Sequence, residues 1–275
     1  MLDLFFNPFF LMTLLAGVGS SLAGGIVGSY VVTKRIVFIS GSISHAVLGG
    51  MGLALYLRRT FHLLWLEPIY GALAFAVLSA FLIGIIHLHY KEREDTVIAS
   101  LWTSGMALGI IFLSLTPGYN VEVLNFLFGN ILWTSQKDLL ILLALDLLIF
   151  ITVFFYHRKF LAICFDEKQA QLQGLRVKSL YFLLLSLVAI TVVLLIQVVG
   201  VILVIAILTL PAALANVFSQ KFTCIMAFAS LLGVAFPFFG LLISFTLNWP
   251  PGSTISLVAT AAYFLGLCLK KTIKR

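Results

Sequence analysis

Residues 179–220, SLYFLLLSLVAITVVLLIQVVGVILVIAILTLPAALANVFSQ, contain no Asp, Glu, Lys or Arg. A helix needs roughly 20 predominantly apolar residues to cross a hydrocarbon core of about 30 Å. This stretch is therefore long enough for two membrane crossings. Gln197 to Gly200 marks the place where the chain can turn between them, because glycine interrupts helices.

Five other stretches lack charged residues in the same way: 4–33, 36–57, 68–90, 96–121 and 222–269. The last is long enough for two crossings, with a break at Asn248 to Gly252, and residues 139–157 add one more around Asp146. Across the chain 62% of residues are apolar and 10% are charged, whereas soluble domains have about 25% charged residues. We therefore expect an all-α, polytopic transmembrane helical bundle of about 8–9 spans, forming one domain over residues 1–275.

Basic residues orient these spans. If the segment 157–178 faces the cytoplasm and nine spans alternate from there, fourteen of the seventeen Lys and Arg residues lie on the cytoplasmic side, as the positive-inside rule requires. The amino terminus is then outside and the carboxyl terminus inside. The net charge of +7 belongs to loops beside membrane lipid, so no nucleic acid is expected as a partner.

Small residues in the first expected span form two ladders with a spacing of four. These ladders are Gly17/Ser21/Gly25 and Ser20/Gly24/Gly28. Such ladders let helix backbones approach closely in lipid, where packing drives helix association. We interpret them as contacts between helices.

The second expected span contains FISGSISHAVLGGMG over residues 38–52. Ser42, His45, Gly49 and Gly52 recur at spacings of three or four, so they share one helix face. A histidine within a membrane span usually faces the bundle interior or a water-filled cavity. His45 is therefore a candidate metal ligand, with an interhelical hydrogen bond as the alternative.

One histidine cannot hold a transition metal alone, because zinc sites usually need about four ligands. A metal pathway at His45 would need ligands from another span or from a second subunit. Asp146 is the other candidate within the membrane, since a buried carboxylate usually faces protein or water. It is interpreted either as part of the pathway or as a hydrogen-bond partner between helices.

The segment from Phe165 to Lys178, FDEKQAQLQGLRVK, predicts a short helix. Asp166 can cap its start, and Gly174 suits the left-handed position that follows its end. Ala170, with Leu172 and Leu175, would offer a small and partly apolar surface. The residues alone leave two readings open, a docking helix for a partner or a surface helix along the membrane.

Motifs of soluble enzymes are absent. There is no G-x-x-x-x-G-K-[ST] sequence, so any ATP hydrolysis must take place in another chain. Ser44 and His45 are a poor nucleophile and base, because adjacent residues on a helix do not face each other. The chain is therefore not expected to be an enzyme.

Eight ordered sequence blocks together resemble the membrane-spanning permease subunit of bacterial ABC-type importers for zinc, manganese and iron(II). The blocks are SSLAGG at 20–25, FISGSISH at 38–45, REDTVIA at 93–99, FLFGN at 126–130, FDEKQA at 165–170, VGVILV at 199–204, LPAA at 210–213 and PGSTISLV at 251–258. The resemblance covers nearly the whole chain.

This resemblance implies a multi-pass protein of the bacterial inner membrane that moves a divalent metal ion by alternating access and holds no permanent cofactor. It implies three partners: a cytoplasmic ATPase subunit, a periplasmic or lipid-anchored metal-binding protein, and a second permease subunit in a homo- or heterodimer. Residues 165–175 match the coupling helix that the ATPase grips, with Asp166, Gln169, Ala170 and Gly174 as its expected residues. His45 matches the family's metal-lining histidine.

The chain departs from the family pattern at Ser42, where the family usually has Asp. Serine is a weak neutral ligand, so a paired carboxylate and imidazole are lost from this subunit. A partner could supply the carboxylate, the metal could pass with fewer hard ligands, or Asp146 could substitute. Imidazole without carboxylate slightly favours zinc or iron(II) over manganese.

Three alternatives follow from the same residues. The first is a permease of the same architecture that carries a metal chelate, such as a siderophore or cobalamin, with little dependence on His45. The second is an intramembrane enzyme, which would need Asp146 to converge on His45. The third is a secondary transporter that works without ATP.

Overall fold

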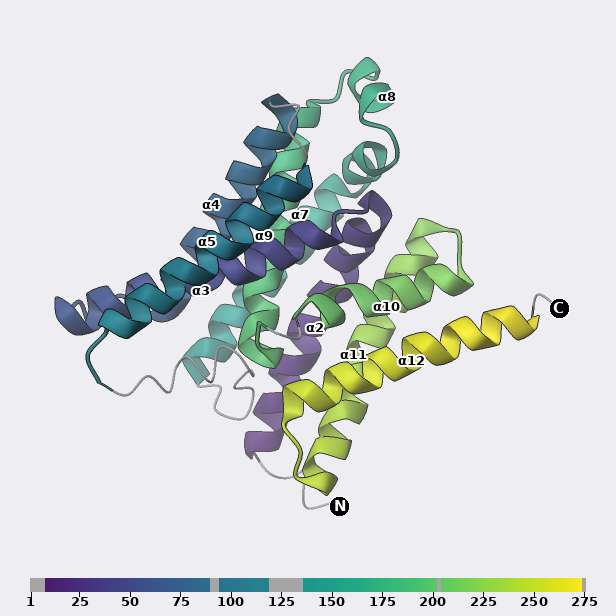
Figure 1. Cartoon of the computed structure of the whole chain (residues 1–275). Coiled ribbons are helices and arrows are strands. Elements are labelled where there is room, and N and C mark those ends of the chain that lie inside the picture. The colour runs from purple at the N-terminus through teal and green to yellow at the C-terminus, as the bar shows by residue number, and fades with distance from the viewer. Residues whose placement is uncertain (1–7, 90–93, 119–135, 202–203, 274–275) are drawn as a thin grey trace. The chain divides into compact units, whose positions relative to one another are not determined.

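A computed structural model describes residues 8–89, 94–118, 136–201 and 204–273 of the chain. Over these residues it contains α-helices and no strand (Figure 1). The helices are α2 (Pro8–Lys34), α3 (Val37–Thr60), α4 (Pro68–His89), α5 (Glu94–Leu115), α7 (Gln136–Phe165), α8 (Glu167–Leu172), α9 (Val177–Val199), α10 (Val204–Phe218), α11 (Phe222–Leu247) and α12 (Pro251–Ile273).

Among the described helices, 8 are long and apolar enough to cross a membrane. The expected all-α polytopic bundle is therefore confirmed. Helix α10 is apolar but has 15 residues, so at about 1.5 Å per residue it is shorter than a hydrocarbon core of about 30 Å. The second crossing expected within residues 179–220 is thus a short helix. The orientation of the termini depends on this count and stays a prediction.

Both expected breaks are confirmed. Helix α9 ends at Val199, and Gly200 follows with φ +83°. Helix α11 ends at Leu247, and Asn248 follows with φ +54°, a left-handed conformation that asparagine tolerates better than most residues. Pro251 then begins α12, as its missing N–H and fixed φ favour at a helix start.

The chain forms two compact units. Unit 1 consists of residues 1–35, 127–155 and 194–275, and unit 2 consists of residues 36–126 and 156–193. Helices α7 and α9 contribute residues to both. The expectation of one permease domain over the whole chain stays a prediction.

In unit 2, helix α3 packs against α4 and α5 (Figure 1), and it does so at glycine residues. Gly50 of α3 and Gly71 of α4 approach so closely that a Cβ on either would collide with the other's carbonyl oxygen. Gly109 of α5 approaches α3 similarly, because a Cβ there would lie 2.9 Å from the Leu48 carbonyl oxygen. These contacts bring three backbones together without intervening side chains.

The direction of α3 and α5 follows from their contacts. Ser42 contacts Ile98, and further along the two helices Leu48 contacts Gly109. Residue numbers rise together in both helices, so α3 and α5 run parallel. Helix α4 lies between them in the chain and runs in the opposite direction.

In unit 1, α2 packs against α10 and α11 through the predicted small-residue ladders. A Cβ on Gly25 would lie 2.7 Å from the Ala229 carbonyl oxygen, and one on Gly28 would collide with the Leu208 carbonyl oxygen. The interpretation of these ladders as helix contacts is therefore confirmed. They bury the small face of α2 against protein rather than lipid.

We predict that Gly105→Val destabilises unit 2, because a Cβ at Gly105 would collide with Ala46 and lie 3.0 Å from the Ala46 nitrogen. Overpacking of this kind typically costs about 1–3 kcal/mol. The expected result is a lower thermal unfolding temperature of the detergent-purified protein. Ala107→Val, on the exposed side of α5, is the matched control. Equal unfolding temperatures for the two variants would contradict the packing described for α3 and α5.

Candidate functional site

Ser42 joins α3 to α5. Its hydroxyl is fully buried and donates a hydrogen bond of 3.0 Å to the carbonyl oxygen of Ile98. A hydroxyl that donates one hydrogen bond still has lone pairs, so Ser42 retains a weak acceptor. The structure therefore gives Ser42 a packing role between two helices, whereas its role as a metal ligand stays a prediction.

His45 lies one helical turn after Ser42 and faces the same helix. Its ring stacks on the indole of Trp102 in α5, with centroids 4.3 Å apart and an interplanar angle of 18°. The side chain is partly buried. A ring nitrogen binds metal in the plane of the imidazole, so stacking on the ring face orients His45 without blocking coordination.

Trp102 also lines an open hollow of about 400 Å³, together with Phe38, Asp95, Ile98 and Ala99. Asp95 is exposed and lies seven residues before Trp102 in α5, which is about 10 Å along the helix axis. Asp95 is thus a carboxylate of α5 that lines the same hollow as Trp102.

Asp146 belongs to unit 1, whereas Ser42 and His45 belong to unit 2. It is 5% exposed, and neither carboxylate oxygen has a hydrogen-bond partner among the described residues. The carboxylate lies against α2, because a Cβ on Gly19 would be 2.8 Å from Asp146 Oδ2. The alternative reading of Asp146 as a hydrogen-bond partner between helices gains no support here.

Within the described residues of either unit, no three His, Cys, Asp or Glu side chains gather in a group that could hold a metal ion. A site at His45 with several strong ligands would therefore require residues from elsewhere. The expectation that His45 acts together with ligands from another span or a second subunit stays a prediction.

Helix α8 begins as its sequence predicts. The Asp166 carboxylate accepts hydrogen bonds from the backbone N–H groups of Lys168 (2.9 Å) and Gln169 (3.1 Å). These bonds satisfy two N–H groups that a helix leaves without partners at its start. The side chain of Gln169 itself is exposed.

The end of α8 also follows the prediction. Gly174 has φ +80°, and the N–H groups of Gly174 and Leu175 donate to the carbonyl oxygens of Gln171 and Ala170. This pair of bonds is a Schellman motif, which favours glycine at the left-handed position. Six helical residues are thus closed at both ends by specific hydrogen bonds.

The expected surface of α8 needs one correction. Ala170 is 1% exposed, whereas Leu172 is 89% exposed. Ala170 is therefore a buried residue rather than part of an exposed surface of α8. Leu172 is the apolar side chain that α8 presents to its surroundings.

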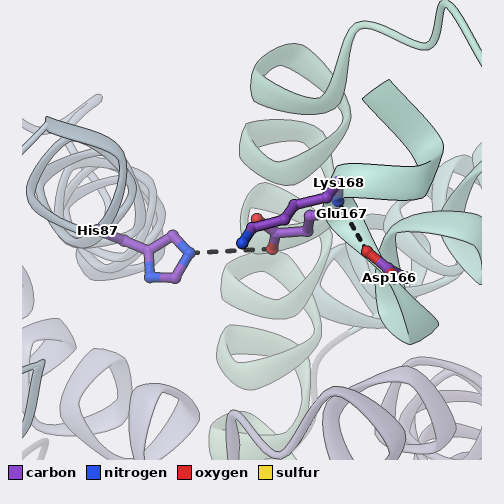
Figure 2. Close-up of polar contacts among 4 residues, drawn as sticks. All are labelled: His87, Asp166, Glu167 and Lys168. Carbon is purple, nitrogen blue, oxygen red and sulfur yellow. Dashed lines mark hydrogen bonds and ion pairs between the residues drawn. The ribbon is translucent and has the colours of Figure 1, made fainter. Parts of the chain in front are cut away.

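The start of α8 also contacts α4. Glu167 Oε1 lies 3.9 Å from His87 Nε2 (Figure 2). The His87 ring stacks on Tyr181 of α9, with ring centroids 4.7 Å apart.

Sequence reasoning missed both the contact between His87 and Glu167 and the stacking of Trp102 on His45. Each joins residues far apart in the chain, so no local spacing could have indicated it. Within the sequence blocks that carry the resemblance, residue 93, residues 126–130 and residues 202–203 lie outside the described residues.

The chain matches the ABC 3 transport family over residues 7–270. It is 51% identical to a probable metal transport system membrane protein of Chlamydia pneumoniae, over 95% of this chain and 89% of the relative. It is 30% identical to the manganese transport system membrane protein MntC of Halalkalibacterium halodurans, over 88% of this chain and 80% of the relative. Its structure resembles that of PsaBC from Streptococcus pneumoniae in complex with Fab, with a TM-score of 0.84, 28% identity, and coverage of 94% of this chain and 91% of that chain. A match of this length, supported by relatives and by a solved structure, places the chain in the ABC 3 transport family.

Proposed function

We propose that the chain is the membrane-spanning permease subunit of an ATP-driven importer that moves a divalent transition-metal ion across the bacterial inner membrane. The observation that carries this proposal is the family match over residues 7–270, combined with relatives named for metal transport that align over most of both chains. An ATPase subunit, a metal-binding protein outside and a second permease subunit complete the proposed assembly.

Manganese is the first cargo to test among zinc, manganese and iron(II). The name of the Halalkalibacterium relative favours it, although the lack of a carboxylate at position 42 slightly favours the other two ions. Because Mn²⁺ prefers oxygen ligands, we propose that the second permease subunit contributes the missing carboxylate. Asp146, buried beside Gly19 in unit 1, stays a candidate residue of the pathway.

His45 acts in this proposal as a transient ligand on the pathway. Conduction requires an ion to bind strongly enough to enter and weakly enough to leave. One imidazole held by Trp102, with ligands shared between subunits, meets this requirement better than a closed site of four protein ligands. Alternating access would expose His45 first to the outside and then to the cytoplasm.

Helix α8 is the proposed contact with the ATPase. Its caps hold six residues in one conformation, and its exposed side chains, Lys168, Gln169, Gln171 and Leu172, are available to a partner. Asp166 and Gly174 would act by fixing the ends of the helix, and Ala170 by anchoring it to unit 2. A rigid short helix of this kind transmits motion better than a flexible loop.

We predict that His45→Ala lowers ATP-dependent Mn²⁺ uptake by roughly tenfold, comparable to the loss of about 1.4 kcal/mol of transition-state stabilisation. Uptake is measured in proteoliposomes that contain the chain with its ATPase and binding protein. Ser104→Ala, at an exposed position of α5, is the control. Normal uptake by a stably assembled His45→Ala complex would remove His45 from the pathway.

We predict that Leu172→Asp weakens capture of the ATPase subunit, because it places a charge on the apolar side chain that α8 exposes most. The measurement is co-purification of the ATPase with the tagged permease. Leu64→Asp is the matched control, since Leu64 is 75% exposed in the connection between α3 and α4. Equal recovery of the ATPase with both variants would argue against α8 as the docking helix.

A further inference from the structure

We propose that His87 is a positioning residue that transmits movement of α8 to the parallel helices α3 and α5, which carry His45 and Trp102. The inference rests on the proposed function, because it concerns how ATP hydrolysis in a partner would move this chain. Every contact on which it depends lies within unit 2.

The first contact joins α4 to α8. His87 lies in the last turn of α4, and its Nε2 is 3.9 Å from Oε1 of Glu167, the first residue of α8 (Figure 2). Glu167 follows the capping residue Asp166 directly, so its backbone is fixed with the start of the helix. Any displacement of α8 therefore moves the carboxylate that faces His87.

The second contact holds the imidazole in place. The face of His87 stacks on Tyr181 in α9, with ring centroids 4.7 Å apart and an interplanar angle of 29°. Tyr181 is 1% exposed, so it is a fixed support. The ring of His87 is thus held by its face, while its edge points toward Glu167.

The third observation places His87 beside α3 and α5. His87 lines a cavity of about 10 Å³ together with Ile39 of α3 and with Val97 and Ile98 of α5. A cavity this small holds at most one water molecule, so these side chains form a packed junction rather than a ligand site. In this proposal, movement of His87 reaches both helices across this narrow gap.

Ile98 continues the path toward His45. Its carbonyl oxygen accepts the hydrogen bond from Ser42, three residues before His45 in α3. One turn further along α5, Trp102 stacks on His45 itself. The predicted pathway residue is thus reached from Glu167 through His87, Ile98 and either Ser42 or Trp102.

The three helices can respond as one body. Gly50 and Gly71 bring α3 and α4 into backbone contact, and Gly105 does the same for α5 and α3 at Ala46. Backbones this close cannot slide past one another without collision, because packed interiors do not deform continuously. A push on the end of α4 would therefore shift all three helices, including His45.

The test uses the assembled permease, ATPase and binding protein in proteoliposomes, with Mn²⁺ as the transported ion. The quantity measured is the number of ions taken up per ATP hydrolysed, with ATPase co-purification as the assembly readout. His87→Phe keeps an aromatic ring on Tyr181 but removes the polar contact with Glu167. Glu167→Gln keeps the shape of the acid and removes its charge. His157→Phe, an identical substitution at a partly buried position of α7, is the matched control.

We expect His87→Phe and Glu167→Gln each to lower the ratio of ions to ATP about fivefold, within the range of coupling energies carried by side-chain networks. The double variant should be no worse than either single variant, because both changes break the same contact. His157→Phe should leave the ratio unchanged. A purely structural role would instead reduce assembly and leave the ratio of the remaining complexes intact.

Two results would overturn the inference. One is an unchanged ratio in an assembled His87→Phe complex, and the other is a double variant whose loss is the product of the two single losses. If His87→Phe fails to assemble, Glu167→Gln alone decides, with an unchanged ratio counting against the inference. Absence of ATP-dependent Mn²⁺ uptake by the wild-type complex would refute the proposed manganese import and this inference together. Normal wild-type uptake with unaffected variants would refute only the role of His87.

Discussion

Close backbone contact between α3, α4 and α5 is the constraint on which unit 2 depends. Lipid tails are as apolar as Leu side chains, so helices gain little by hiding apolar surface from them and must associate through close packing and interhelical hydrogen bonds. Gly50, Gly71 and Gly105 allow that approach, and the Ser42 hydroxyl adds a hydrogen bond to it. The orientation of His45 follows, because Trp102 can stack on it only while α3 and α5 remain side by side.

The sequence predicted those features that local chemistry determines. Charge-free stretches located the helices, Gly200 and Asn248 marked the breaks, and Asp166 with Gly174 predicted both ends of α8. Each prediction needed only a few neighbouring residues. The roles of His45, Ser42 and Asp146 in metal movement stay predictions.

Partners across the unit could not be predicted in the same way. A membrane helix is apolar toward lipid and also toward its neighbours, so hydrophobic periodicity does not indicate which face meets protein. The sequence therefore gave no sign that Trp102 faces His45 or that His87 faces Glu167. The burial of Ala170 was missed for a related reason, since a helix of six residues is too short to show a periodic pattern. The length of α10 could not be predicted either, because the apolar composition of residues 179–220 does not show where this helix begins.

The parallel course of α3 and α5 has an electrostatic consequence. Each helix carries about half a positive charge at its start and half a negative charge at its end, so like ends of the two dipoles lie together and repel. Asp95 stands in the first turn of α5, while Arg58 and Arg59 stand in the last turn of α3, where Arg59 also donates a hydrogen bond of 3.1 Å to the Pro117 carbonyl oxygen beyond α5. The Asp95 carboxylate compensates the positive start of α5, and the two guanidinium groups compensate the negative end of α3. Charged residues at the ends of the two helices therefore help to hold them together.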